Sequence, residues 1–368
     1  MLPLKDLVIG TSGGLYRVVP NQYQYGVSPK TARIELSQEE PCLEQGVIVG
    51  NTIFYPDAAG TRLLEYKYEA NIANSSSNDV SKFIFPIFNT DDIIKIDYQH
   101  SPTPKIWVLV RSGLLYCLTY HRQEEYYAWS KQDLGKVTDI VVLPKSGSEL
   151  CDSLIATVER TDTTGTVYTF EKLNELQVYE PVAGAANSKK TVSHLDSFKA
   201  YTKNSTGNLV ITMTTDGYAI GDLVDVVVDG KYEGQKTIAS ANTFTGYTIP
   251  ANTNTLIVGK KFEGELKMIH PTWDGSNKPA FGAETIRVIS VKPFLVNSVK
   301  YDIGIANQFN TRNLISSLNY DNDSLFTGFD KELPLVGSTF GVDKTAVIKQ
   351  TEPYPLTVAS LVTKTDLN

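Results

Sequence analysis

The sequence predicts an all-β protein: a partial or small β-propeller followed by a β-barrel or sandwich-like domain. The chain contains 20 Tyr, with Val and Thr in short runs that are punctuated by 26 Gly and 17 Pro, a composition typical of strands and turns. Hydrophobic residues make up 41% and charged residues 20% of the chain, which excludes wholesale disorder. A repeated strand–turn–strand pattern in the N-terminal half favours the propeller.

The clearest strand pattern occupies residues 104–135. Trp107 and Leu109 alternate with Ile106 and Val108, and the alternation resumes after a Ser-Gly break at 112–113. A polar turn at 121–124 and an aromatic run at 126–130 follow. Because a period of two interrupted by turn residues indicates strands, this segment predicts three consecutive strands.

Four segments of the N-terminal half share one outline, an apolar strand, a Gly-containing turn and a second apolar strand. They are residues 7–19, 47–68, 106–120 and 154–170, and their starts lie about 40 to 60 residues apart, near the repeat length of propeller blades. We therefore expect blade-like units over residues 1–180. A β-sandwich with evenly spaced hairpins fits the spacing equally well.

A small, polar stretch at 179–193 predicts a domain boundary. Beyond it we expect a β-rich barrel or sandwich domain over 181–305, with strands at 208–215, 223–228 and 255–259 and a hairpin turn at Asp229-Gly230. Residues 306–368 are expected to form a C-terminal extension that returns to pack on the ring. Within it, 306–318 is a weak helix candidate, and its Asn and Ser content fits a loop nearly as well.

The residues that usually carry chemistry are scattered. Four histidines lie in separate segments, and three cysteines lie far apart without a C-x-x-C pair, which argues against zinc sites and disulfides. Two acidic clusters lack the Gly and terminal Glu of a calcium loop. We therefore expect a non-enzyme without cofactor or metal. The residues concerned are His100, His121, His194, His270, Cys42, Cys117, Cys151, Asp91, Asp92, Asp321 and Asp323.

The tryptophans, a glycine-rich run and the net charge each bear on whether the chain binds a ligand. Trp107, Trp129 and Trp273 could line a sugar site, but the first two alternate with apolar neighbours, which favours packing. The run Ser12-Gly13-Gly14 predicts a hairpin turn, since no Lys-Ser/Thr follows it as in a phosphate-binding loop. The net charge of −7 argues against tight, sequence-independent nucleic-acid binding, although it is compatible with DNA sliding past.

A set of residues along the chain matches the motifs of a known family in the same order, most densely within 104–135. The set includes Gly13, Gly14, Trp107, Arg111, Gly113, Leu115, Tyr120, Arg122, Glu124, Trp129, Asp229, Gly230, Pro353 and Pro355. With these residues the chain resembles the tail nozzle proteins (tail tubular protein B) of short-tailed bacteriophages. The matches span most of the chain, but they cover only the C-terminal half of the family.

The resemblance implies a structural virion protein that forms the distal ring of a short tail. Such a ring, a homohexamer, retains the genome and conducts double-stranded DNA during ejection without binding a specific sequence. Its implied partners are the tail adaptor protein and tail fibres, with contact to the host surface. The implied location is the virion, after assembly in the cytoplasm of the bacterial host. Polar turn residues Asp162, Thr163, Thr164 and Gly165 are candidates for a loop that narrows the lumen.

Two other functions remain open from the sequence. A receptor- or glycan-binding tail protein of the same virion would use exposed aromatic side chains, such as Trp273. A propeller hydrolase would need acidic side chains that converge at one mouth of the ring. The lack of a catalytic constellation favours the nozzle over the hydrolase.

Overall fold

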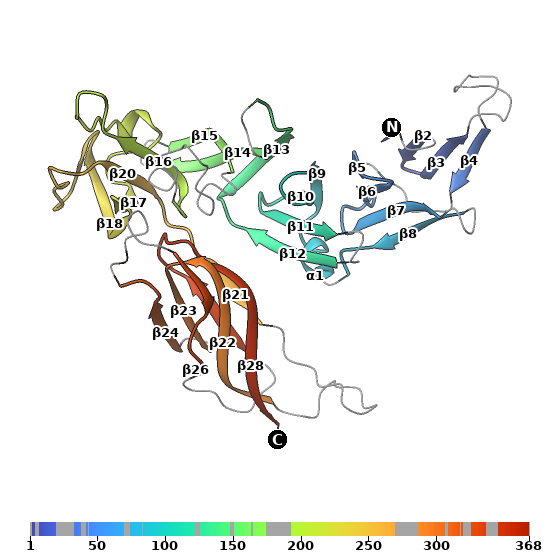
Figure 1. Ribbon diagram of the computed structural model, residues 1–368. Coiled ribbons are helices and arrows are strands. Elements are labelled where there is room, and N and C mark those ends of the chain that lie inside the picture. Colours follow the sequence, from blue (N-terminus) through green and yellow to red (C-terminus); the bar gives the residue numbers. More distant parts are fainter. Residues whose placement is uncertain are drawn as a thin grey trace. The chain divides into compact units, whose positions relative to one another are not determined.

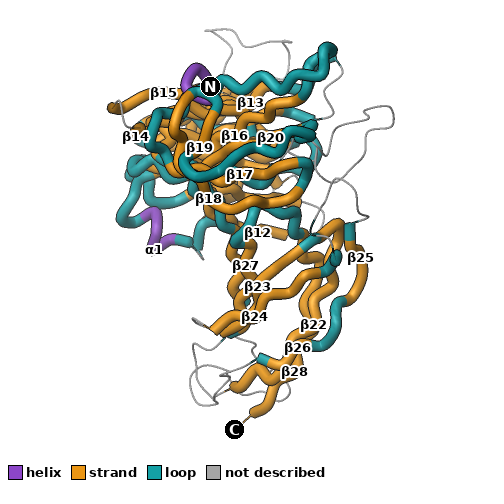
Figure 2. The backbone as a smooth tube through the Cα atoms, turned by 90° about the vertical axis from the view of Figure 1, so that its left-hand side faces the viewer, coloured by secondary structure: helices purple, strands orange, loops and turns teal. Residues whose placement is uncertain are grey.

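The computed structural model describes residues 2–3, 7–19, 33–37, 42, 44–69, 74–82, 84–121, 126–147, 151–162, 165–173, 193–268, 286–305, 308–316, 318, 325–335 and 345–367. Within these ranges almost all regular structure is antiparallel strand (Figures 1 and 2). The exceptions are a four-residue helix, α1 (Phe85–Phe88), and a 3₁₀ turn at Met213–Thr215. The prediction of an all-β fold is confirmed.

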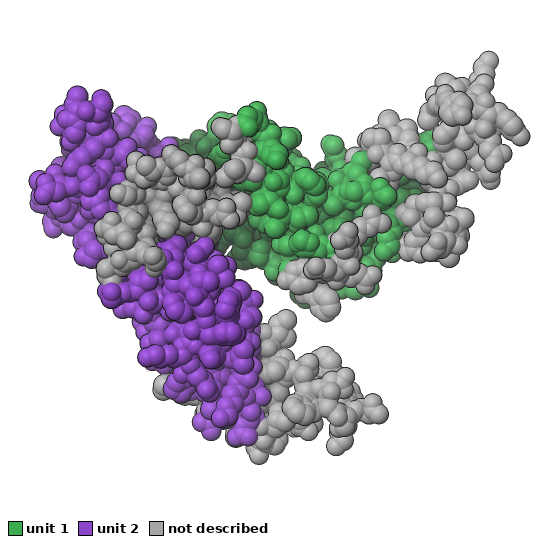
Figure 3. All heavy atoms as spheres, viewed as in Figure 1, with its two compact units in different colours: residues 1–161, 165–175 green, residues 162–164, 176–368 purple. Residues whose placement is uncertain are grey.

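The chain forms two compact units, which Figure 3 colours separately. Unit 1 contains residues 1–161 and 165–175, and unit 2 contains residues 162–164 and 176–368. The ranges 181–305 and 306–368, which the sequence suggested as separate parts, both belong to unit 2.

Unit 1 consists of four antiparallel sheets that follow one another along the chain (Figure 1). In each sheet, neighbours in the sequence are neighbours in space, as in the blades of a β-propeller. The first sheet is β1 (Leu2–Pro3), β2 (Leu7–Thr11), β3 (Gly14–Val19) and β4 (Arg33–Ser37), and the second is β5 (Val47–Val49), β6 (Thr52–Pro56), β7 (Leu63–Glu69) and β8 (Asn74–Asp79). The third is β9 (Ile93–Gln99), β10 (Lys105–Val110), β11 (Leu115–His121) and β12 (Tyr126–Gln132), and the fourth is β13 (Lys136–Leu143), β14 (Ser153–Asp162) and β15 (Gly165–Lys172).

The four repeated segments of the sequence match these sheets. Each contains an antiparallel hairpin, and the three strands predicted over 104–135 are β10, β11 and β12. The third sheet is apolar on both faces because successive residues of its strands, which point to opposite faces, are nearly all apolar. Trp107 pairs with Cys117 on one face, and Ile106 pairs with Leu118 on the other.

The core of unit 1 lies between consecutive sheets rather than at one centre. One cluster joins the first and second sheets through Val8, Leu15, Tyr55 and Tyr66, among others. A second cluster joins the second and third sheets through Phe54, Leu63, Val108 and Leu118, with Phe88 of α1. A third joins the third and fourth sheets through Trp107, Leu115, Ile140 and Val158. Face-to-face packing of successive sheets is the way blades bury their apolar surface.

Unit 2 begins with a five-stranded sheet. Its order is β16 (Asp196–Thr202), β20 (Thr255–Lys260), β17 (Leu223–Val228), β18 (Lys231–Ser240) and β19 (Thr243–Phe244). Strands β17 and β18 are joined by the predicted Asp229-Gly230 turn, in which both residues have positive φ, 46° and 79°. Two positive φ angles in succession produce the twist that a two-residue hairpin needs. This hairpin and the strands predicted at 223–228 and 255–259 are confirmed.

The rest of unit 2 is a two-layered sandwich. One layer has the order β21 (Gly264–Lys267), β27 (Ala346–Gln350), β23 (Lys300–Ile305) and β24 (Gln308–Asn313). In the other, β22 (Ile286–Ser298) pairs with β25 (Phe326–Phe329), β26 (Leu333–Pro334) and β28 (Thr357–Leu367). Val291 and Leu295 of β22 pack against Ile303 and Ile348 of the facing layer. No sheet formed by the described strands closes into a barrel, so the sandwich alternative describes this region.

Two local predictions are wrong. The helix candidate at 306–318 contains strand β24, which pairs with β23 so closely that a Cβ on Gly304 would collide with the backbone of Gln308. The strand predicted at 208–215 is an isolated bridge at Leu209 followed by the 3₁₀ turn. There the Thr212 hydroxyl bonds to Asp216, and such local side-chain bonds compete with strand pairing.

Candidate functional site

The two tryptophans of the 104–135 segment lie on opposite faces of the third sheet. Trp107, on β10, is 2% exposed and packs toward the fourth sheet, and its Nε1 donates a hydrogen bond to Oε1 of Gln99 on the neighbouring strand β9 at 2.8 Å. Trp129, on β12, packs toward the second sheet, and its Nε1 donates to the Val80 carbonyl at 3.1 Å. The two indoles therefore do not form one ligand site. Each is part of a different junction between sheets.

A buried carboxylate joins the second and third sheets. Glu65, on β7, is 2% exposed and accepts hydrogen bonds from the hydroxyls of Tyr120 and Tyr127, each at 3.0 Å. The Tyr120 ring meets the edge of Phe54 with centroids 4.9 Å apart. Because a buried charge is tolerated only when hydrogen-bonded, both hydroxyls are needed to hold Glu65 inside this junction.

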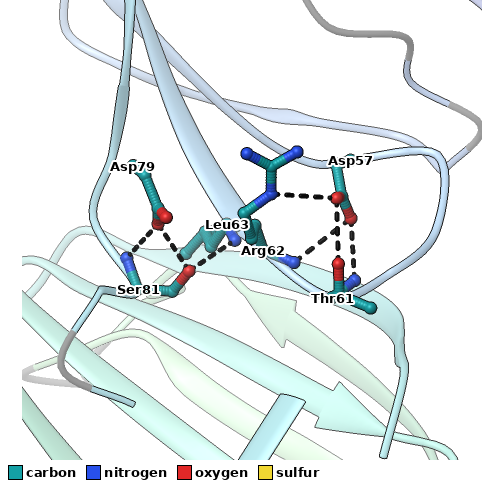
Figure 4. A network of polar contacts seen from close by, with 6 residues as sticks. All are labelled: Asp57, Thr61, Arg62, Leu63, Asp79 and Ser81. Atoms are coloured by element: carbon teal, nitrogen blue, oxygen red, sulfur yellow. Dashed lines mark hydrogen bonds and ion pairs between the residues drawn. The ribbon is translucent and has the colours of Figure 1, made fainter. Parts of the chain in front are cut away.

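Polar contacts also fix the turn between β6 and β7 of the second sheet (Figure 4). The Asp57 carboxylate accepts hydrogen bonds from the backbone N–H and the hydroxyl of Thr61 at 2.7 and 3.0 Å, and it forms an ion pair with Arg62 at 3.2 Å. The carbonyl of Gly60, in the same turn, accepts a hydrogen bond from the Ile93 N–H of β9 at 2.8 Å. The turn thus sets the position of the third sheet against the second.

A second polar group in Figure 4 links the start of β7 to the end of β8. Asp79 accepts hydrogen bonds from the Ser81 N–H at 2.8 Å and its hydroxyl at 2.6 Å, and Ser81 Oγ accepts one from the Leu63 N–H at 3.0 Å. These hydrogen bonds give the Leu63 and Ser81 N–H groups and the Ser81 hydroxyl partners within the protein, which favours a rigid sheet end.

The hairpin between β10 and β11 contacts the fourth sheet. Gly113 has φ +92°, and a Cβ there would lie 2.7 Å from Lys136 Cγ. Its carbonyl accepts a hydrogen bond from the Val137 N–H at 2.9 Å. Arg111 is exposed and pairs with Asp92 at 3.1 Å, whereas Leu115 is fully buried. The close backbone approach explains why glycine stands at 113.

Electrostatics reinforce the junction between the third and fourth sheets. Asp152 accepts hydrogen bonds from the backbone N–H groups of His100, Ser101 and Lys145 at 2.8 to 3.0 Å. Burial alone would raise the pKa of the Asp152 carboxyl, but these three donors outweigh it and hold the pKa below its usual range. The hydrogen bond from Lys95 likewise lowers the pKa of Asp139, so both carboxylates remain charged in neutral solution.

The outward face of the fourth sheet exposes a group of large apolar side chains. Val141 of β13 pairs with Ile155 of β14, and Thr157 and Glu159 lie on the same face of β14 as Ile155. The Tyr168 hydroxyl of β15 donates a hydrogen bond to Glu159, so Tyr168 lies on this face as well. Phe170 lies two residues after Tyr168 and therefore on the same side. We call Val141, Leu143, Tyr168 and Phe170 the outer face; they are 44%, 49%, 63% and 84% exposed. Sequence reasoning missed this face, although the alternation Val167-Tyr168-Thr169-Phe170 contained its signal.

The remaining motif residues lie in turns of both units. Gly13 lies in the β2–β3 turn and Gly14 begins β3, and the Thr11 hydroxyl donates to the Gly14 carbonyl at 2.9 Å. Residues 10–14 have the spacing G-x-S-x-G, but they form a hairpin rather than the strand–turn–helix elbow of a hydrolase nucleophile.

Residues Pro353 and Pro355 are buried in unit 2, and the Pro355 carbonyl accepts a hydrogen bond from the Val299 N–H at 3.1 Å. The carboxylate of Asp229 accepts hydrogen bonds from the N–H groups of Asn254 and Thr255, which fixes its turn. Of the candidate lumen loop, Asp162 ends β14 and Gly165 begins β15. The positions of Arg122, Glu124, Thr163, Thr164, His270 and Trp273 lie outside the described residues.

Within the described ranges, no three His, Cys, Asp or Glu side chains come together as a metal site. His100 and His121 belong to the third sheet region, and His194 precedes β16 in unit 2. Burial lowers the pKa of His194 to about 4. None of the described helices is long and apolar enough to cross a membrane.

Comparison with known proteins leaves the family open. No protein-family model matches the chain, and no curated protein matches it. A solved structure described as "Glycoside hydrolase" is similar to it over 98% of this chain and 97% of that chain, with 9% sequence identity and a TM-score of 0.25. At that TM-score the likeness supports no statement about fold or activity.

Proposed function

We propose that this chain is a structural subunit of a short phage tail, a wall of the distal nozzle ring that retains the genome and conducts DNA during ejection. The observation that carries the proposal is the way unit 1 is built. Each of its successive sheets is locked to the next by an apolar cluster and, at the second and third junctions, by buried polar contacts. Such a stack is rigid, which suits a channel wall better than a site that must open for a substrate.

The outer face is where we place the contact between subunits. At the three internal junctions both facing sheets bury their apolar residues, whereas the fourth sheet has one buried apolar face and one exposed face that carries Val141, Leu143, Tyr168 and Phe170 beside the Lys136–Glu159 ion pair. The outer face thus offers one more face-to-face contact of the kind that successive sheets of unit 1 make at its three internal junctions. We assign its occupant as a second copy of this chain, in a head-to-tail contact that closes a ring.

The charge of the chain fits transient passage of DNA. Its net charge of −7 provides no general attraction for phosphates, so DNA would not be held along the wall. No catalytic function is needed for this role.

Replacing Phe170 by Asp tests the assembly. The substitution puts a charge at the centre of the proposed contact, so the ring should dissociate into monomers, measured by light scattering on the purified chain with its tail adaptor. Val210→Asp is the matched control, because Val210 is an exposed (58%) apolar residue of unit 2 outside the proposed contact. If wild type stays monomeric with its tail neighbours present, or if both variants assemble like wild type, the proposal is wrong.

A glycan-binding tail protein is the second candidate, and the exposed rings of Tyr168 and Phe170 favour it because sugars stack on aromatic faces. Phe170→Leu separates the two functions. It keeps the apolar surface but removes the ring, so a subunit contact should survive it, while binding on a glycan array should be lost. Loss of glycan binding with unchanged assembly would favour the second candidate.

A further inference from the structure

A buried carboxylate in unit 2 lacks hydrogen bonds of ordinary geometry. Asp225, in the middle of β17, is 1% exposed, and no described residue places a donor in hydrogen-bonding geometry on either carboxylate oxygen, although the Tyr232 hydroxyl lies close enough to favour the charged form. Its neighbours Val224 and Val226 pack on the opposite face of the sheet, so Asp225 points to the same side as Val227. Burying an ionised carboxylate without hydrogen bonds is strongly unfavourable, so this residue is not explained by the stability of the fold.

The side to which Asp225 points is a joint within unit 2. Val227 and Ile257 of the five-stranded sheet pack there against Val299 and Tyr354, which belong to the C-terminal sandwich region. The Tyr354 hydroxyl accepts a hydrogen bond from the Tyr232 N–H at 3.1 Å. We call this contact the Asp225 joint. It connects the five-stranded sheet to the segments around β23 and β28.

Several charged and titratable groups surround Asp225 from the elements packed on it. Tyr232 comes from β18, Lys261 and Glu263 follow β20, and Glu352 precedes β28 and is paired with Lys300 of β23 at 2.5 Å. Burial raises the pKa of Asp225, the Tyr232 hydroxyl and Lys261 lower it, and Glu263 and Glu352 raise it; the net shift is upward. Only Tyr232 and Lys261 favour the charged form, and they do not offset the burial.

We propose that Asp225 makes this joint sensitive to pH: the joint closes over the protonated carboxyl and loosens when the carboxyl loses its proton. When the joint opens, water can hydrate the ionised carboxylate. A group whose pKa is raised in the closed state stabilises that state below the pKa of the open state, and this stability is lost as the pH rises through the raised pKa. Within that window the opening equilibrium should shift by about tenfold for each pH unit.

Hydrogen exchange on the full chain tests the proposal. Protection factors, corrected for the intrinsic pH dependence of exchange, are measured for residues 223–232 and 351–356 between about pH 4 and about pH 8, a range that begins near the ordinary pKa of an aspartate. In wild type, protection of both segments should fall as the pH rises. Strands β22 and β28 serve as the internal reference and should not change in parallel.

Two variants make the test specific. In Asp225→Asn the side chain keeps its shape but cannot ionise, so protection should be independent of pH. In Tyr232→Phe the hydroxyl that favours the charged form is absent, so the fall should move to higher pH, a shift that a purely structural role would not produce. Asp366→Asn, an exposed carboxylate of the same unit, should behave like wild type. A flat wild-type profile, or an equal fall in Asp225→Asn, would overturn the proposal.

Discussion

The hydroxyl of Tyr120 donates a hydrogen bond to the buried carboxylate of Glu65 at 3.0 Å, although the two residues lie 55 positions apart in the sequence. This contact joins β11 of the third sheet to β7 of the second. Unit 1 therefore depends on polar bonds between blade-like sheets as well as on apolar packing.

Removing that hydroxyl should destabilise unit 1. Tyr120→Phe leaves a buried charge with one donor fewer, and we expect a loss of about 1.5–3 kcal/mol in the free energy of unfolding, measured by urea denaturation. Tyr168→Phe is the matched control, because it removes an exposed hydroxyl whose bond to Glu159 is 3.4 Å long. It should cost less than about 0.5 kcal/mol. Equal losses in the two variants would show that the buried hydrogen bond to Glu65 stabilises unit 1 no more than the exposed bond to Glu159 does.

Adding one methyl group at Gly113 should disturb the junction between the third and fourth sheets. Gly113→Ala places a Cβ 2.7 Å from Lys136 Cγ and 3.0 Å from the Val137 carbonyl oxygen at a φ of +92°. We expect a loss of about 2–4 kcal/mol, from backbone strain plus the collision. Gly217→Ala has a similar φ, +98°, with no atom within 4 Å of the new Cβ, so it reports the strain alone. Thermal unfolding should give the larger loss for Gly113; the reverse order would contradict the close approach.

Acid should weaken the C-terminal sandwich through Asp330. Burial alone would raise the pKa of this carboxyl, but hydrogen bonds from Arg312 at 2.9 Å and from Tyr301 at 2.6 Å hold it below its usual range. A group with a lowered pKa stabilises the fold above its unfolded pKa, and that stability is lost as the pH falls through the folded pKa.

The variant Asp330→Asn should therefore be less stable at neutral pH, by about 1–3 kcal/mol, and should lose less stability between neutral pH and acid than wild type. Urea unfolding of the whole chain at several pH values measures both effects. The expected slope has the opposite sign to that of Asp225, so the two aspartates can be distinguished in one pH series. A wild-type and a variant profile that run parallel would contradict the role of Asp330.

The sequence predicted the strands well where apolar residues alternate, because that pattern depends only on neighbours in the chain. The hairpins around Gly113 and Asp229 were found in this way. Strand β24 was missed because its polar sequence, QFNTRN, has no apolar period, and only its pairing with β23 makes it a strand.

The candidate sites were less predictable, because they depend on contacts between distant segments. Nothing near Glu65 in the sequence indicates that Tyr120 and Tyr127 will meet it. Asp225 did carry a signal, since a single acidic residue inside the run Val224-Asp225-Val226-Val227-Val228 conflicts with burial. The exposure of Phe170 needed the structure, because alternation alone does not say which face is covered.

The order of the sheets has a consequence for how the chain is made. In unit 1 every sheet is complete before the next begins, so each can fold and dock as the chain leaves the ribosome, with contacts only to its predecessor. Unit 2 is different, because β22 pairs along its length with β28, near the C-terminus, and β23 pairs with β27. Contacts this far apart in sequence form slowly. The sandwich must wait until β28 has been synthesised, so we expect truncation within β28 to leave unit 1 folded and unit 2 incomplete.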